Sequence, residues 1–432
     1  MTRCFLGMAG LGVLCGVLMN VAQAAPPDLA DFPKLSAATD WPWWRGPTRN
    51  GLSVSSKVPT ELGPNQNVKW KVPVPGRGHG SPIVVGERVF LPTADEAQQR
   101  HLVLAYDRAT GKELWQVEVN RGGFPANNHP KNTEASPTIA CDGERLLASF
   151  FHHQKIEVVA LGLEEGKILW RQVAGPFNPQ RFEYGYAPSP LLYQDLVIVA
   201  GEYDGSSFLT ALNRASGKPV WKQRRPENLS FSSPVVANVA GREQLLLSGA
   251  EHVASYDPST GKPLWNVMGT TTATCGTMVW WDDIVFASGG YPKAETLAVK
   301  ADGSRRVLWK NNQKCYEQSL IVVDGYVYAL TDQGILFCWR GIDGKEMWKQ
   351  RLTGPVSASA VLAGGHIYWA NELGTLYVFK PNPEKLETVA ENQIGTESFA
   401  SPAICGGQIF LRVAEQTSGR RQEFLYCFEL PK

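Results

Sequence analysis

Several side chains that could bind a ligand or a metal ion stand at one position of a repeating pattern. The pattern is a Ser-Pro dipeptide, or an aligned Thr-Met, Ser-Leu or Ser-Ala pair, which returns from Ser81 to Ser401. Two residues before it, in successive units, stand His79, Glu134, Ala187, Phe231, Cys275, Glu317, Ser357 and Phe399. Imidazole, carboxylate and thiol groups can ligate metal ions or pair with charged ligands. If these positions share one layer around an axis, their side chains converge on a common site.

The connections that lead into this layer add further polar and aromatic side chains, namely Arg77, His129, Lys131, Tyr184 and Tyr186. We predict a ligand-binding site formed by Arg77, His79, Glu134, Tyr184, Tyr186, Cys275 and Glu317. The alternative is a hydrated funnel whose polar groups bind only water. His79 and Glu134 could pair, which would keep the imidazole charged near neutral pH. No spacing among these residues selects a metal ion, and no residue is assigned a catalytic role.

The elements that must position this layer are short strands joined by a recurring turn. Ala105 to Trp115 is the clearest copy, with Asp107 and Gly111 at the turn and Trp115 in the strand that follows. An Asp side chain can bond the backbone of such a turn, while Gly accepts the positive φ that a Cβ resists. The copy at Ser255 to Trp265 keeps Asp, Thr, Gly and Trp at the same offsets. The motif therefore predicts a repeated hairpin with a Trp that packs between neighbouring sheets.

The tryptophans give the number of repeats. They are Trp70, Trp115, Trp170, Trp221, Trp265, Trp309 and Trp348, separated by 39 to 55 residues. This separation matches one four-stranded propeller blade of roughly 40 to 50 residues. The last unit stops at Lys432 after three strands, and Val68 to Pro73 can supply the fourth. We predict an all-β, eight-bladed β-propeller over residues 68–432, closed by an N-terminal strand that completes the last blade.

The residues before the propeller divide into three parts. Residues 1–24 carry Arg3, an apolar run and an Ala-Gln-Ala end, which predicts a cleavable signal peptide and a periplasmic or secreted protein without a membrane span in the mature chain. Residues 25–40 are rich in Ala and Pro and predict a flexible spacer. The Trp-rich stretch from Trp41 to Gly51 could stack on a sugar or a partner, or could cap one face of the propeller.

Charge and cysteine usage exclude some classes of protein. Without Arg3, the 42 Lys and Arg become 41, equal to the 41 Asp and Glu, which argues against nucleic-acid binding. Six of the eight cysteines lie after residue 24, with no Cys-x-x-Cys among them. Most resemble small buried hydrophobic residues, although Cys275 and Cys315 could form a disulfide between adjacent blades.

The motif Ala105-x-Asp107-x-x-Thr110-Gly111-x-x-x-Trp115 resembles the tryptophan-docking motif of PQQ-like, quinoprotein-type eight-bladed propellers. This resemblance covers residues 68–432 and implies two branches. One branch contains PQQ-dependent alcohol dehydrogenases; the other contains non-catalytic envelope propellers such as BamB. The first branch implies a vicinal Cys-Cys pair, a Ca²⁺ held by Glu and Asn, and an Asp base. This chain has no adjacent cysteines and no segment that matches the calcium site or the base.

The sequence therefore predicts a monomeric scaffold that binds an envelope protein or a small polar ligand. A PQQ-dependent oxidoreductase with Ca²⁺ is the alternative function.

Overall fold

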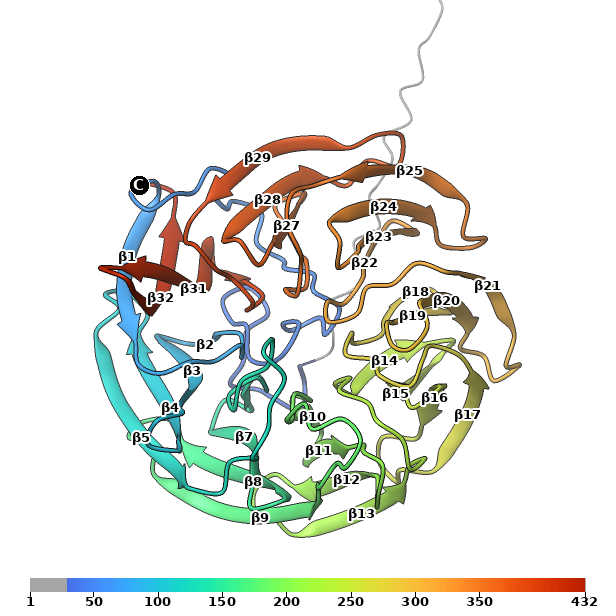
Figure 1. The fold of residues 1–432 in the computed structure, drawn as a ribbon, viewed down its shortest axis with the longest axis horizontal. Coiled ribbons are helices and arrows are strands. Elements are labelled where there is room, and N and C mark those ends of the chain that lie inside the picture. The colour runs from blue at the N-terminus through green and yellow to red at the C-terminus, as the bar shows by residue number, and fades with distance from the viewer. Residues whose placement is uncertain (1–28, 432) are drawn as a thin grey trace, which may run out of the picture.

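The computed structural model describes residues 29–431, which form eight four-stranded antiparallel sheets arranged in a ring (Figure 1). The predicted eight-bladed propeller is confirmed. Within the described range there is no helix, and so none that is long and apolar enough to cross a membrane. The predicted signal peptide, residues 1–24, lies outside the described residues.

Each blade runs from an inner strand at the channel to an outer strand at the rim. Blades 1 to 4 contain β2 (Ile83–Val85), β3 (Arg88–Asp95), β4 (Arg100–Asp107), β5 (Glu113–Arg121); β6 (Ala140–Cys141), β7 (Arg145–His152), β8 (Lys155–Gly162), β9 (Ile168–Pro176); β10 (Leu191–Tyr193), β11 (Leu196–Gly201), β12 (Phe208–Asn213), β13 (Pro219–Arg224); and β14 (Val235–Val239), β15 (Arg242–Gly249), β16 (His252–Tyr256), β17 (Pro263–Met268). Blades 5 to 8 contain β18 (Val279–Trp281), β19 (Ile284–Gly289), β20 (Glu295–Lys300), β21 (Val307–Asn311); β22 (Ile321–Val323), β23 (Tyr326–Leu330), β24 (Ile335–Arg340), β25 (Glu346–Arg351); β26 (Val361–Ala363), β27 (His366–Ala370), β28 (Thr375–Lys380), β29 (Glu387–Gln393); and β30 (Ala403–Cys405), β31 (Gln408–Thr417), β32 (Arg420–Glu429) with β1 (Val68–Val74).

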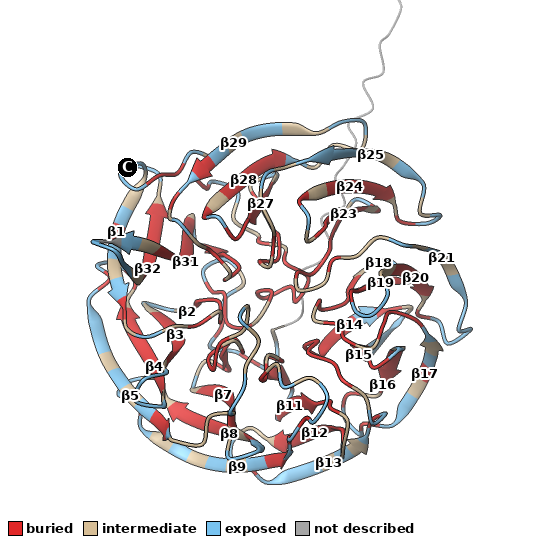
Figure 2. Cartoon of the chain, in the orientation of Figure 1, coloured by how far each residue is buried: buried red, intermediate tan, exposed pale blue. Residues whose placement is uncertain are grey.

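The ring closes as predicted, because β1 pairs antiparallel with β32 and completes blade 8 (Figure 1). The register places Trp70 opposite Cys427 and Val74 opposite Glu423. A buried arginine also joins the two ends of the ring. Arg412 of β31 pairs with Glu423 and donates to the carbonyl of Pro92 in blade 1 at 2.7 Å. Middle strands are buried while outer strands face solvent, so the core lies between the blades (Figure 2).

Neighbouring blades are held together by the predicted Trp and Gly positions. Gly111 has φ of +74°, and a Cβ there would lie 2.7 Å from the ring of Trp70 in the preceding blade. Gly is therefore required twice, by the turn and by the close approach of the indole. The Trp70 indole N–H donates to the carbonyl of Arg108 in the same turn at 2.9 Å. Equivalent bonds to the next blade are made by Trp115, Trp170, Trp221, Trp309 and Trp348.

Trp265 reaches the next blade through an intermediate side chain. Its indole N–H donates to Oε1 of Gln244 at 2.7 Å, and Nε2 of Gln244 donates to the carbonyl of Ala301 in blade 5 at 2.8 Å. Trp265 is 2% exposed, whereas Trp115 is only partly buried. The seven predicted docking tryptophans therefore share one role but differ in burial.

The residues before β1 pack against one face of the ring. Phe32 and Leu35 are buried, and Phe32 makes an edge contact with Trp43 at 5.2 Å between ring centroids. The expectation of a flexible spacer over residues 25–40 is therefore wrong for the described part from residue 29, because Phe32 and Leu35 are buried in one apolar cluster with Trp43.

The Trp-rich stretch crosses the channel and contacts inner strands of most blades. Trp41 forms a β-bridge with Val84 of blade 1, and Leu52 forms one with Leu362 of blade 7. Between them, Arg49 donates to the carbonyl of Leu192 at 2.7 Å. Arg45 donates to that of Leu320 at 3.0 Å. Trp41 and Trp43 are 3% and 2% exposed, so their rings are not free to stack on a sugar.

Candidate functional site

One Ser or Thr residue of each blade lies just before the inner strand, and these residues form a ring around the channel that we call the hydroxyl belt. At the belt position, a backbone N–H donates to the hydroxyl of the next blade at 2.8–3.1 Å. These bonds run from Ser81 through Thr138 and Ser189 to Ser233, and from Thr277 through Ser319, Ser359 and Ser401 back to Ser81. The Thr277 hydroxyl accepts the indole N–H of Trp44 at 2.8 Å. The recurring Ser-Pro pattern therefore has a structural role, with one difference in register.

The difference is in blade 2, where Thr138 and not Ser136 occupies the belt position. The inner strands confirm this shift, because β6 begins at Ala140, two residues after Thr138, as β2 begins two residues after Ser81. Two residues before Thr138 stands Ser136, so Ser136 replaces Glu134 in the predicted layer. The prediction of Glu134 was wrong because Ser136-Pro137-Thr138 contains two hydroxyl residues, and Thr138, not the Ser136 that precedes Pro, is in register with the other blades.

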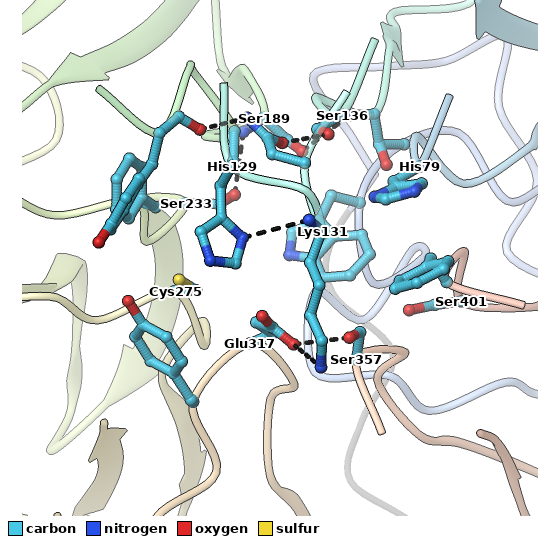
Figure 3. Close-up of a pocket in the computed structure, with 18 residues that line it drawn as sticks. His79, His129, Lys131, Ser136, Ser189, Ser233, Cys275, Glu317, Ser357 and Ser401 are labelled. Atoms are coloured by element: carbon cyan, nitrogen blue, oxygen red, sulfur yellow. Dashed lines mark hydrogen bonds and ion pairs between the residues drawn. The ribbon is translucent and has the colours of Figure 1, made fainter. Parts of the chain in front are cut away.

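The layer surrounds a cavity of about 150 Å³ at the channel mouth. All eight members of the corrected layer line it: His79, Ser136, Ala187, Phe231, Cys275, Glu317, Ser357 and Phe399. Trp44 of the N-terminal cap also lines it and connects the cap to the cavity. Of the seven predicted site residues, His79, Tyr184, Cys275 and Glu317 are brought together here, and Figure 3 shows His79, Cys275 and Glu317 around the opening.

The other three predicted residues do not line the cavity. Arg77 donates to the carbonyl of Pro130 at 3.1 Å, and the Tyr186 hydroxyl is buried and donates to the carbonyl of Ala200 at 3.0 Å. Glu134 accepts a hydrogen bond from Asn128 at 2.6 Å within its own loop. Burial raises the pKa of Glu134 to about 7, although the Asn128 bond opposes this. These three side chains support the loops around the cavity.

His79 is not held in the charged form. Its ring stacks on Phe399 at 4.3 Å between centroids, with 9° between the planes. Burial lowers the pKa of His79 well below its usual value, and the charges of Arg77 and Arg412 add to this effect. The expectation that Glu134 keeps this imidazole charged is wrong, because Glu134 is out of register and the nearby charges are positive.

The charged part of the cavity is centred on Lys131, which extends across the opening (Figure 3). Its ammonium lies 2.7 Å from Oε1 of Glu372 and 4.0 Å from Oε2 of Glu317. The Ser357 hydroxyl lies 2.6 Å from a carboxylate oxygen of each glutamate. Burial raises the pKa of Glu317, while the Ser357 bond and the Lys131 charge oppose the rise. Burial disfavours the Lys131 ammonium, but the Glu372 bond and the nearby carboxylates outweigh it and raise its pKa.

Aromatic rings form another part of the lining. Tyr184, Phe231 and Tyr316 contribute to it, with His129 in edge contact with Tyr184 at 4.8 Å. Burial lowers the pKa of His129, and the Lys131 charge adds to this. Cys275 is a free thiol, as is Cys315, and burial raises the pKa of both thiols. The site therefore combines aromatic faces, hydroxyls and a lysine–carboxylate cluster.

Sequence reasoning missed Glu372 and Tyr316. Tyr316 directly precedes Glu317, so the layer could have pointed to it. Glu372 lies between β27 and β28, and its contact with Lys131 joins residues 241 positions apart. Nothing in the local sequence indicates that this turn reaches the channel.

Among residues 29–431, no three His, Cys, Asp or Glu side chains are grouped so as to hold a metal ion. The carboxylates nearest the cavity, Glu317 and Glu372, are engaged by Ser357 and Lys131. A Ca²⁺ ion needs several oxygen ligands that are free to coordinate it.

Comparison with known families places the chain nearer to BamB than to the dehydrogenases. The family model described as outer membrane protein assembly factor BamB matches residues 99–350 and 318–382. The chain belongs to this family. Among BamB-family relatives, the outer membrane protein assembly factor BamB of Yersinia pestis is 23% identical over 354 residues, 74% of this chain and 81% of the relative. A polyvinylalcohol dehydrogenase of Sphingopyxis sp. (strain 113P3) is 27% identical over 235 residues, 50% of this chain but 32% of that enzyme.

Solved structures share the fold of this BamB-family chain at low identity. The structure of BamB from Moraxella catarrhalis superposes with a TM-score of 0.59 at 14% identity, covering 84% of this chain and 97% of that one. A europium-containing methanol dehydrogenase gives a TM-score of 0.68 at 12% identity, covering 93% of this chain and 100% of that one. BamB and the methanol dehydrogenase thus share the propeller fold, so the fold alone does not determine the activity.

Proposed function

We propose that this BamB-family propeller is a non-catalytic binding scaffold that takes part in the assembly of outer-membrane proteins. The family match, which spans residues 99–382, is the observation that carries the proposal. The rigid ring supports it, because eight blades tied by a hydroxyl belt hold loops from every blade at one mouth.

The proposed place of action is the periplasm or the cell exterior, which the chain reaches by export with a signal peptide, residues 1–24, that is then cleaved. The partner is an envelope protein, and the protein acts as a monomer. The buried cap leaves the mouth lined by Lys131, Tyr184 and Glu317 as the face on which a partner would find charged and aromatic side chains.

The test is deletion of the gene in the organism that encodes it, followed by quantification of β-barrel proteins in the outer membrane. We expect their amount to fall and to return when the full chain is supplied. A chain lacking residues 2–24 is the matched control and should not restore them, because it lacks the export signal. Unchanged amounts after deletion would overturn the scaffold proposal.

The dehydrogenase alternative gives a different result in a direct assay. Purified protein is mixed with PQQ and Ca²⁺, and the quinone absorption and dye-linked alcohol oxidation are measured. We expect neither signal, because the cavity carboxylates are already engaged. Both signals together would replace the scaffold with an oxidoreductase.

A further inference from the structure

Lys131 occupies the carboxylate cluster of the cavity as an internal cation. It comes from the connection between β5 and β6, whereas Glu317 precedes β22 and Glu372 follows β27. The connection between blades 1 and 2 therefore brings this ammonium to carboxylates of blades 6 and 7, as Figure 3 shows for Lys131 and Glu317. It is 37% exposed, while Glu372 is 9% exposed, so the lysine is the accessible member of the pair.

The charges at this cluster are not balanced. One ammonium faces two carboxylates, and the Ser357 hydroxyl can donate a single proton between them. The lowered pKa values of His79 and His129 leave both imidazoles neutral at pH 7, so they add no positive charge. A second cation, or a cation better placed than Lys131, would therefore be attracted to the cavity.

The aromatic side chains favour the same kind of ligand. Tyr184, Phe231 and Tyr316 line the cavity, and aromatic faces attract ammonium groups. Outside the cavity lining, the Lys314 ammonium makes one such contact, 5.4 Å from the centre of the Tyr316 ring, while it pairs with Asp332 at 3.2 Å. A cavity of about 150 Å³ has room for an alkylammonium side chain.

We propose that the cavity binds an alkylammonium group, supplied by a lysine side chain of a protein partner, and that Lys131 holds this place until the partner displaces it. The identity of the source as a protein segment rests on the proposed scaffold function. Displacement exchanges one ammonium for another, so the buried carboxylate of Glu372 is not left without a cation.

The test measures binding of three capped tripeptides, acetyl-Gly-Lys-Gly-amide and its Gln and Glu counterparts, by isothermal titration calorimetry. We expect only the lysine peptide to bind. Lys131→Met keeps the length of the side chain and removes the competing charge, so it should tighten lysine-peptide binding about tenfold. The Glu317→Gln, Glu372→Gln double variant should weaken it at least tenfold. Lys380→Met is the matched control, because Lys380 pairs with Glu387 at 3.4 Å at the outer hairpin of blade 7.

The proposal would be overturned if the lysine and glutamine peptides bound equally well, or if the lysine peptide bound neither the wild type nor any variant. It would also be overturned if Lys131→Met melted like the wild type but did not bind the lysine peptide more tightly. Spermidine serves as the second probe. Tighter binding of spermidine than of the peptide would assign the site to free polyamines and refute a protein source. If gene deletion lowers the amount of outer-membrane proteins while the lysine peptide fails to bind, the scaffold function is supported and the cation site is refuted. If the peptide binds while gene deletion has no effect, the cation site is supported and the scaffold function is refuted.

Discussion

Replacing Trp265 with alanine should destabilise the propeller more than the same change at Trp115, although the two tryptophans occupy the same place in the motif. Trp265 is 2% exposed and packs in a cluster with Met278 and Leu297, whereas Trp115 is only partly buried. Removing a fully buried large aromatic side chain costs about 3–5 kcal/mol. Since the hydrophobic contribution follows the area removed from water, the cost at Trp115 should be about 2 kcal/mol.

The hydrogen bond of Trp265 changes this difference little. Its acceptor, Oε1 of Gln244, also accepts from Ser255 at 2.6 Å, so the acceptor stays satisfied in the Ala variant. The assay is urea unfolding followed by circular dichroism, which does not depend on the tryptophan removed. We expect both variants to keep the wild-type slope and to differ in midpoint. Equal midpoints, or a larger loss at Trp115, would refute the argument that burial sets the contribution of each docking tryptophan.

Three further outcomes are expected. His101 is buried between Phe124 and Phe150, and burial lowers its pKa to about 3, so below pH 6.5 the unfolded chain takes up a proton that the folded chain does not. The wild type should therefore lose about 2 kcal/mol of unfolding free energy relative to His101→Phe when the pH falls from 7 to 5. Urea titrations that give parallel pH profiles for the two proteins would contradict this. Deleting residues 25–73 removes most of β1 and exposes the edge of β32, so this chain should aggregate in light scattering, whereas equal solubility to the full chain would show that β1 is dispensable for closure. The affinity for the lysine peptide should fall as the pH drops through the raised pKa of Glu317, because protonation removes the charge that attracts the cation. The charged groups that face this carboxylate are Lys131, Glu372 and Asp332. Calorimetry that finds a constant affinity down to pH 4 would exclude Glu317 as the residue that binds the cation.

The amino-acid sequence alone determined the fold. The spacing of the tryptophans and the Asp and Gly of each turn repeat because each blade is built by the same short-range rules, and the truncated last unit required β1 to close the ring. The Ser-Pro pattern likewise located seven of the eight layer members that line the cavity. Local patterns of this kind are legible because a strand, a turn and its glycine are contiguous in the chain.

The tertiary structure decided which side chains meet. In blade 2 the belt selects Thr138, and this two-residue shift removes Glu134 from the layer. The contact between Lys131 and Glu372 joins two connections 241 residues apart, and its existence depends on the path of both loops over the channel. Such contacts are set by the shape of the closed ring and by loop conformation, neither of which leaves a periodic signal in the sequence.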